Sequence, residues 1–361
     1  MDSQRSLFGD EFTYGPEALQ QPVPHGGRSH SVRSNAPGRR GEPVRPVIAS
    51  EELQRLARRL PPNLRLGTSS WSFPGWQGLV YAQRRLGRPE TEERLARGGL
   101  AAYAAHPLLR ADSLDRTFYA PLGVEAFAGY AADVPDDFRF IVKAPAAVTD
   151  PVTRRLGSAR PVVDNPSFLD ASVAREAFVR PAVDGLGRKA GALVFQFPPL
   201  GRQRLAQPGR MISQIAAFLT ALPRGPVYAV EVRDPALACP ALARSLRDVG
   251  AVVCLAIHAR MPPVAEQSQA FAASIGVGPL IVRWNLHAGR AYEDARDDYH
   301  PFNQLVEEDV PTRSALGELV MKAVAEGREA VVTINNKAEG SAPLSVERLA
   351  EACAGRAGDP A

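Results

Sequence analysis

The sequence predicts a (β/α)8 TIM-like barrel, an α/β fold in which eight parallel strands close into a ring inside a layer of helices. Eight short apolar runs recur between residues 64 and 353, and most are apolar enough for strands that are buried on both faces. Segments with helical periodicity separate most of these runs. The composition agrees, because 45% hydrophobic and 23% charged residues are typical of a globular chain.

The expected strands each end in polar or aromatic residues. They lie at residues 64–67, 113–117, 138–143, 192–197, 227–232, 251–257, 280–285 and 330–334. Helical patterns lie at residues 51–60, 100–105, 167–179, 211–222, 236–249, 313–325 and 345–354. Because the loops that follow parallel strands meet at one face of a barrel, we expect the polar strand ends to form a single site, with the long connections 84–99 and 144–166 beside it.

We expect one barrel domain over residues 48–361 and a disordered tail over residues 1–47. The tail is rich in Pro, Gly, Ser and Arg and shows no apolar periodicity. Near its start, Gln4, Leu7 and Phe8 stand in a segment that is similar to the short peptide by which bacterial replication and repair proteins bind the DNA sliding clamp. The clamp is therefore an expected partner of residues 4–8. The alternative is that Leu7 and Phe8 pack onto the barrel.

Several function classes find no support in the sequence. It has no GxGxxG turn, GxxxxGK[ST] loop or GxSxG elbow, so we expect no nucleotide cofactor and leave any other cofactor unidentified. The three cysteines are unclustered and no HExxH spacing occurs, so we expect no catalytic metal. No apolar run is long enough to span a bilayer and no secretory signal is present, which favours the cytoplasm. The formal net charge of +4 is compatible with an anionic partner.

Lys143, Glu231 and Arg233 are the candidates for catalysis and charge binding. Lys143 ends the third expected strand, where a lysine suits an anion, a developing negative charge or a Schiff base. Glu231 and Arg233 alternate about an apolar residue, which points both side chains to the barrel interior. There they form either a structural ion pair or a general acid/base with an orienting cation. We take Glu231 and Lys143 as the catalytic candidates.

Other strand ends supply candidates for substrate binding. Trp71 and Tyr119 either stack on a substrate ring or pack in the core. At the ends of the fourth, seventh and eighth strands, amides, a guanidinium and an imidazole either bind hydroxyl or phosphate oxygens or form a buried structural network. These residues are Gln196, Arg283, His287, Asn335 and Asn336.

Six motifs in this order resemble the YecE-like domain-of-unknown-function family. They are Gly67-Thr68-Ser69-Ser70-Trp71, Thr117-Phe118-Tyr119, Phe140-Ile141-Val142-Lys143, Gln196-Phe197-Pro198-Pro199, Glu231-Val232-Arg233 and Asn335-Asn336. The resemblance implies a TIM barrel over about residues 64–354, and the family has no established activity. Its Glu-x-Asn is replaced here by Ser113-Leu114-Asp115, which weakens any role for Asp115. Arg283 carries over, whereas His287 is a secondary candidate because its segment matches only loosely.

Arginine, lysine, amide and aromatic groups outnumber carboxylates at the expected mouth of the barrel. This balance favours an enzyme, a hydrolase or a lyase, that acts on an anionic, phosphate-bearing substrate such as a nucleotide or a nucleic acid. One alternative is a carbohydrate or sugar-phosphate enzyme in which Trp71, Tyr119 and Trp284 stack on a sugar. Another is a non-catalytic barrel that binds a ligand.

Overall fold

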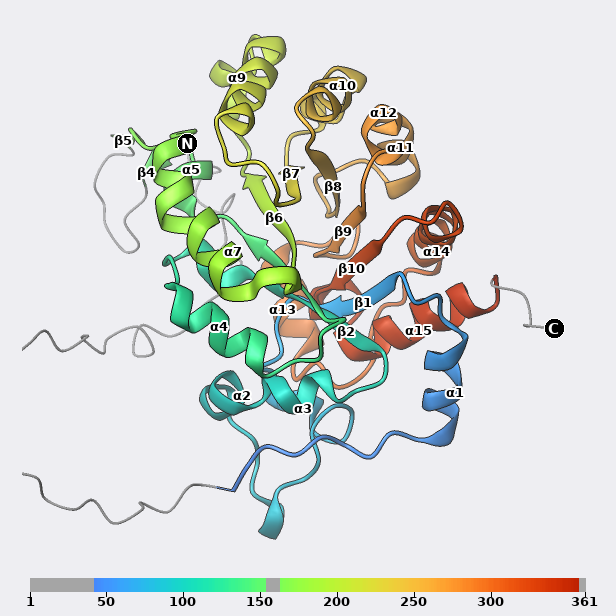
Figure 1. Ribbon diagram of the computed structural model, residues 1–361. Helices are drawn as coiled ribbons and strands as arrows, with labels where there is room; N and C mark the ends of the chain where they lie inside the picture. The colour runs from blue at the N-terminus through green and yellow to red at the C-terminus, as the bar shows by residue number, and fades with distance from the viewer. Residues whose placement is uncertain (1–41, 154–162, 357–361) are drawn as a thin grey trace, which may run out of the picture.

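The eight predicted strands form a closed parallel barrel in the computed structural model, which describes residues 42–153 and 163–356. Figure 1 shows the barrel inside a ring of helices, with α4 and α7 on the left, α9 and α10 at the top and α14 and α15 on the right. The strands follow one another in the order β1-β10-β9-β8-β7-β6-β3-β2. The predicted fold class is thus confirmed.

The barrel strands are β1 (Leu64–Thr68), β2 (Leu109–Leu114), β3 (Arg139–Lys143), β6 (Ala190–Phe197), β7 (Tyr228–Val232), β8 (Val252–Ile257), β9 (Leu280–Trp284) and β10 (Ala330–Ile334). A small antiparallel pair, β4 (Val152–Thr153) and β5 (Val163–Asp164), follows β3. The helices are α1 (Glu51–Arg59), α2 (Glu92–Gly98), α3 (Leu100–Ala104), α4 (Val124–Ala132), α5 (Ala146–Thr149), α6 (Ala171–Ala174), α7 (Arg180–Leu186), α8 (Gly201–Arg204), α9 (Pro208–Thr220), α10 (Pro240–Asp248), α11 (Val264–Ala270), α12 (Ala272–Ile275), α13 (Tyr292–Tyr299), α14 (Val310–Ala325) and α15 (Ala342–Ala354).

The second strand is the one whose predicted position is wrong. The prediction was residues 113–117, but β2 ends at Leu114, and Asp115–Phe118 forms a turn of 3-10 helix. Arg110 and Asp112 interrupt the apolar run, so its first half does not look like a strand in the sequence. Pairing with β1 and β3 on either side determines the true limits, because a barrel strand must match its neighbours in register.

Helix positions were predicted with mixed success. α1 begins after Ser50, whose side chain accepts a hydrogen bond from the Leu53 amide, as the sequence indicated. The pattern at residues 167–179 begins later than expected, because Asp170 caps α6 and the chain continues through a π-helical turn into α7. α4 and α13 were not predicted, since both have weak amphipathic patterns.

The interior of the barrel is layered along its axis. Ala111, Val194, Ala229, Ile281 and Val331 fill an apolar layer from five different strands. Because side chains of a strand alternate between its two faces, the residues two positions further along the same strands also point inward, towards the carboxyl ends. The apolar layer therefore closes the barrel below the strand ends, which we call the mouth.

β1 and β2 approach each other closely at Gly67. A Cβ atom at this position would lie 1.8 Å from the carbonyl oxygen of Ala111, so no other residue fits without a shift of the backbone. The pairing of the two strands is irregular at the same point. Gly67 therefore permits β1 and β2 to approach just below the mouth.

The expected boundary of the tail at residue 47 lies a few residues too late. The amide of Val47 donates to the carbonyl of Val80, and the amide of Ala82 donates to the carbonyl of Arg45, each at 2.9 Å. This short antiparallel contact joins residues 45–47 to the first barrel connection. The rest of the predicted tail, with Gln4, Leu7 and Phe8, lies outside the described residues. No helix among residues 42–153 and 163–356 is long and apolar enough to cross a membrane.

Candidate active site

Arg283 lies at the centre of the mouth and joins two carboxylates from opposite parts of the barrel. It extends from β9 with 1% of its surface exposed. Nη1 donates to Glu231 Oε2 at 2.6 Å, and Nη2 donates to both oxygens of Asp115 at 2.7 and 2.6 Å. Burial alone would lower the pKa of Arg283, but Asp115 and Glu231 raise it above its usual value. Its guanidinium is therefore permanently charged and fixed in position.

Glu231 connects Arg283 to Arg233, its neighbour on the same face of β7. Arg233 donates from Nε to Glu231 Oε1 at 2.7 Å, and its Nη2 lies 2.6 Å from the same oxygen. The predicted inward orientation of this alternating pair is confirmed, since both side chains are buried and in contact. Burial alone would raise the pKa of Glu231, but Arg283 and Arg233 lower it below its usual value, so the carboxylate is ionised.

Gln196 of β6 completes the network on the side of β7. Its carboxamide oxygen accepts from Arg283 Nη1 at 3.2 Å and from Arg233 Nη2 at 3.4 Å. β6 and β7 pair so that Gln196 lies opposite Glu231, and the parallel register therefore places the amide beside the carboxylate. Gln196 thus spaces the two guanidinium groups.

Lys143 is the third cation of the mouth. It ends β3, is 3% exposed, and its Nζ lies 4.1 Å from the centre of the Phe118 ring. Its positive charge contributes to the lowered pKa of Glu231, which places the ammonium within electrostatic reach of that carboxylate. Three buried cations, Lys143, Arg233 and Arg283, and two buried carboxylates, Asp115 and Glu231, therefore share this end of the barrel.

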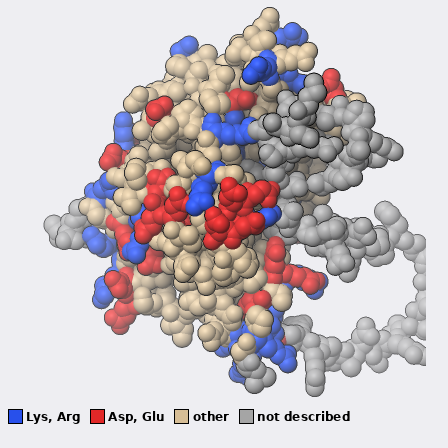
Figure 2. Space-filling view, turned by 180° about the vertical axis from the view of Figure 1, so that it is seen from behind, with Lys and Arg blue, Asp and Glu red and all other residues tan. Residues whose placement is uncertain are grey.

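The outer surface carries charges of both signs. Figure 2 shows the face behind that of Figure 1, where acidic side chains gather near the centre with basic ones between them. α13, which lies behind the barrel in Figure 1, contributes four exposed carboxylates, Glu293, Asp294, Asp297 and Asp298. A uniform basic surface thus does not surround the barrel, and the concentration of cations is a property of its interior.

Comparison with protein families shows to which family the chain belongs. The model of the family described as "Protein of unknown function DUF72" matches residues 65–360. The chain belongs to the DUF72 family. This confirms the family that the sequence motifs indicated, and the match spans the whole barrel. No curated protein matches the chain.

Two solved structures of DUF72 proteins have the same fold. One, from Thermotoga maritima MSB8, is 17% identical over 80% of this chain and 98% of that chain, with a TM-score of 0.53. The other, from Enterococcus faecalis V583, is 16% identical over 80% of this chain and 95% of that chain, with a TM-score of 0.52. At these identities the likeness shows the fold alone, so the chemistry must be inferred from this chain.

The aromatic candidates do not join the mouth network of this DUF72 barrel. Trp71 is 4% exposed, donates from its indole nitrogen to the carbonyl of Leu95 at 3.1 Å, and packs edge to face on Tyr130. It therefore lies in the layer between strands and helices. Trp284 is fully buried in the same core cluster. Tyr119 is 41% exposed and contacts Phe118, so it is placed to meet a ligand from outside.

The two asparagines after β10 have different surroundings. Asn335 donates to Ser69 Oγ at 2.7 Å and accepts from the amide of Lys337, which joins the ends of β10 and β1. The carboxamide oxygen of Asn336 accepts from the Trp76 indole at 3.1 Å and from the amide of Ala342 at 2.8 Å. These contacts engage Asn336 in holding the connection to α15, so its geometry favours a structural role.

His287 lies at the rim, apart from the charged network. Its Nδ1 is 2.7 Å from the carbonyl oxygen of Ala288 and 3.9 Å from a carboxylate oxygen of Glu307. Glu307 in turn accepts hydrogen bonds from Arg290 and Tyr299. His287 therefore belongs to a rim cluster with the segment around α13.

Two mouth residues were underrated in the sequence. A role for Asp115 was considered weakened because its segment departs from the family pattern, yet it binds Arg283 through both oxygens. Its position at a strand end was the available signal. Cys254 was treated only as a buried thiol, but it points inward from β8, and its Sγ lies 3.8 Å from Glu231 Oε2. Burial and Glu231 raise the pKa of this thiol well above its usual value.

Among the described residues, no group of three His, Cys, Asp or Glu side chains is arranged to hold a metal ion. The two carboxylates of the mouth are instead engaged by guanidinium groups.

Proposed function

We propose that this DUF72 protein is an enzyme that binds a phosphate-bearing substrate, a nucleotide or a nucleic acid, at the mouth of the barrel and cleaves a bond to its phosphate. The observation that carries the proposal is the concentration of three cationic side chains, Lys143, Arg233 and Arg283, in a buried end of the barrel. Cleavage by water makes it a hydrolase, and elimination makes it a lyase.

The physical argument rests on desolvation and fixed geometry. Charged groups interact more strongly with an anion in a poorly solvated site than in water. Arginine presents a planar set of donors that matches phosphate oxygens. Here Glu231 holds the guanidinium plane of Arg233 in place, and Asp115 holds that of Arg283. A neutral sugar would leave this charge uncompensated. The balance of charges thus favours a phosphate-bearing substrate over a plain carbohydrate.

Each side chain has a distinct role in the proposal. Lys143 and Arg233 hold the phosphate oxygens, and Arg283, which both carboxylates bind, fixes the arrangement. Both oxygens of Glu231 already accept hydrogen bonds, so its first role is to orient the arginines. Glu231 acts as a general base only when Arg233 turns towards the substrate and releases Oε1.

Binding of a nucleoside monophosphate, measured by isothermal titration calorimetry, tests the proposal. We expect Lys143→Met to weaken binding by about tenfold or more, because it removes a charge-assisted contact of about 1.5–3 kcal/mol. Lys322→Met, on the outer helix α14, is the matched control and should bind like the wild type. Equal affinities for the two variants would disprove a phosphate site at Lys143. Turnover of phosphodiesters and phosphomonoesters is then compared between wild type and Lys143→Met.

We also propose that the N-terminal segment containing Gln4, Leu7 and Phe8 binds the DNA sliding clamp. The support is the sequence pattern alone: a polar anchor followed by two adjacent apolar side chains suited to a hydrophobic groove. A synthetic peptide of residues 1–12 should bind purified clamp in a fluorescence anisotropy assay. Phe8→Ala should abolish this binding, whereas failure of the native peptide to bind would remove the link to replication.

A further inference from the structure

A cavity lined by both polar and apolar side chains lies outside the barrel, on the connection that follows β6. It has a volume of about 440 Å³ and is lined by residues of α8 and the first turns of α9, together with Phe168 from the segment after β5. Figure 1 shows α9 on the same side of the barrel as the β4–β5 pair. Phe168 is half-buried and Met211 is 4% exposed, so two apolar side chains form its floor.

The walls of the cavity are formed by hydrogen-bonding side chains. Gln203, Gln207 and Gln214 make no side-chain hydrogen bond with any residue that the structure describes, and Arg210 makes no ion pair there. Arg204 donates to Asp164 at 2.5 Å, which holds α8 against β5. The cavity therefore offers three carboxamides and a guanidinium with unused hydrogen-bonding capacity above an apolar floor.

This combination matches one ligand chemistry better than others. A carboxamide donates and accepts at once and so pairs with the edge of a nucleobase, while an aromatic ring stacks on its face. An arginine binds the adjoining phosphate. Inorganic phosphate would leave the apolar floor unused. We propose that this cavity is a nucleotide subsite, which binds the second unit of a single-stranded nucleic acid whose first phosphate occupies the mouth.

Contacts join the segments that line the cavity to sequence neighbours of mouth residues. The Phe168 ring packs edge to face on Phe197 at 6.2 Å, and Phe197 directly follows Gln196. A carboxylate oxygen of Asp234 accepts a hydrogen bond from the amide of Leu200 at 2.8 Å, and Asp234 directly follows Arg233. Phe168, in the floor, and the residue that precedes α8 thus contact sequence neighbours of mouth residues. The inference rests on the proposed function and specifies its substrate as an oligonucleotide.

The test compares ligands of two lengths on the full chain. Affinities for labelled single-stranded DNA tetranucleotides are measured by fluorescence anisotropy, and those for the matching nucleoside monophosphates by calorimetry. We expect the tetranucleotide to bind about tenfold or more tightly, because a stacked base contributes about that factor. Gln207→Ala and Arg210→Ala should lose most of this gain. Both residues are exposed, so neither substitution threatens the fold.

Matched controls separate this inference from the proposed function. Arg224→Ala, an exposed arginine beyond the other end of α9, should retain the tetranucleotide affinity of the wild type. Monophosphate affinity should stay unchanged in Arg210→Ala and fall in Lys143→Met. Equal binding of both ligands by the wild type, or equal effects of Arg210→Ala and Arg224→Ala, would overturn the subsite. If Lys143→Met changes neither affinity while Arg210→Ala still weakens the tetranucleotide, the proposed function fails, the first phosphate is not held at the mouth, and only the binding of a nucleotide unit at the cavity stands.

Discussion

One charged cluster at each end of the barrel has the same numbers of cations and carboxylates, but the two clusters differ in how far their carboxylates are buried. One cluster at the base, at the amino ends of the strands, consists of three arginines and two carboxylates, Arg65, Arg110, Arg139, Asp137 and Glu329. The cluster around Arg283 at the mouth likewise consists of three cations and two carboxylates. At the base the exposed fractions of the carboxylate side chains reach 51% for Asp137 and 32% for Glu329, whereas Glu231 at the mouth is fully buried.

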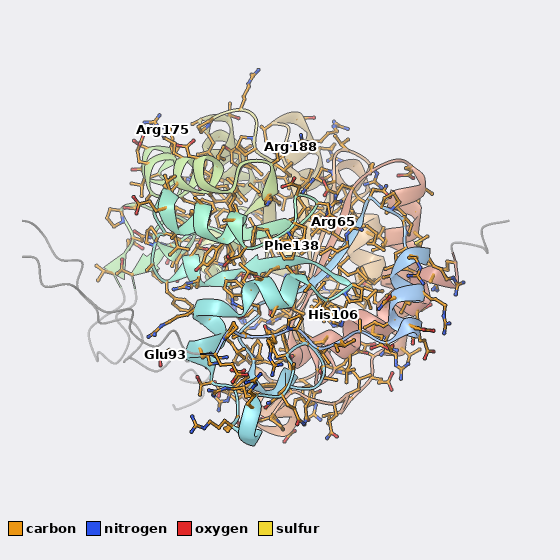
Figure 3. All side chains as sticks on the ribbon, turned by 60° about the horizontal axis from the view of Figure 1, so that its bottom comes forward. Arg65, Glu93, His106, Phe138, Arg175 and Arg188 are labelled. Carbon is orange, nitrogen blue, oxygen red and sulfur yellow. The ribbon has the colours of Figure 1, made fainter. Side chains whose placement is uncertain are left out.

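The partners of the arginines differ as well. At the base they bind backbone carbonyls in addition to the carboxylates: Arg65 Nε donates to Asp137 O at 2.6 Å, and Arg139 Nη1 donates to Phe138 O at 2.9 Å. Figure 3, in which the bottom of Figure 1 comes forward, labels Arg65 close to Phe138. At the mouth the arginines bind side chains that the barrel holds out of water. The comparison teaches that the two clusters differ in the burial of their charges and not in the number of charges.

The largest expected difference between the two ends appears on loss of one carboxylate. Glu231→Gln should lower the free energy of unfolding by about 3–5 kcal/mol, because it leaves two buried guanidinium groups short of a counter-charge. Glu329→Gln removes a half-exposed partner at the base and should lower it by less than about 1 kcal/mol. Chemical denaturation of both variants measures the difference. Similar losses would mean that the mouth is as well solvated as the base.

As the pH falls, the protein should lose the contribution of His106, near the base, to its free energy of unfolding before it loses the contribution of Glu231 at the mouth. His106, labelled in Figure 3, is buried, and desolvation lowers its pKa from 6.5 to about 4. Between these values the unfolded chain binds more protons, so stability falls as the pH drops, by on the order of 2–3 kcal/mol. His106→Asn should remove this slope in denaturation curves between pH 7 and 4. The contribution of Glu231, whose pKa is lowered, is lost only below its unfolded value of 4.5.

A carboxyl group on β2, that of Asp112, should make stability depend on pH in the opposite direction from His106. Asp112 is fully buried and faces the layer of Tyr103, and neither of its carboxyl oxygens has a hydrogen-bond partner among the described residues. Burial and Asp115 raise its pKa well above 3.8. The folded state then binds more protons, so stability falls as the pH rises above 3.8. Asp112→Asn should stabilise the protein by about 1–2 kcal/mol at pH 8 and leave it unchanged at pH 4, as thermal denaturation can show.

The smallest expected effect concerns the exposed pair at the base. Arg110 donates to Asp137 from two nitrogens, with 29% and 51% of the two side chains exposed. Asp137→Asn should lower the free energy of unfolding by about 0.5 kcal/mol at low salt and by nothing measurable at 1 M salt, since the pair is screened. The effect of Glu231→Gln should persist at 1 M salt. A loss for Asp137→Asn that is as large and as salt-independent would erase the distinction between the two ends.

Local pattern was sufficient for several features of the barrel. The run at residues 330–334 was predicted with its correct limits, and Glu231 and Arg233 were correctly placed on the inner face, because strand periodicity of two needs no knowledge of partners. The pattern failed at β2, where Arg110 and Asp112 interrupt the apolar run. Their side chains are accommodated by neighbours far away in the sequence, so no local signal reveals that strand.

The sequence by itself therefore determined the closed eight-stranded barrel, the inward pair on β7 and the membership of DUF72, since all three depend on periodicity and local motifs. Only the tertiary structure decided which polar residues meet. Asp115 and Arg283 are in contact although 168 positions of sequence separate them. Trp71 and Asn336, by contrast, are engaged in hydrogen bonds that hold loops and helices in place. The reason is physical: barrel closure sets which strand ends face each other, and burial then decides which charges need a counter-charge.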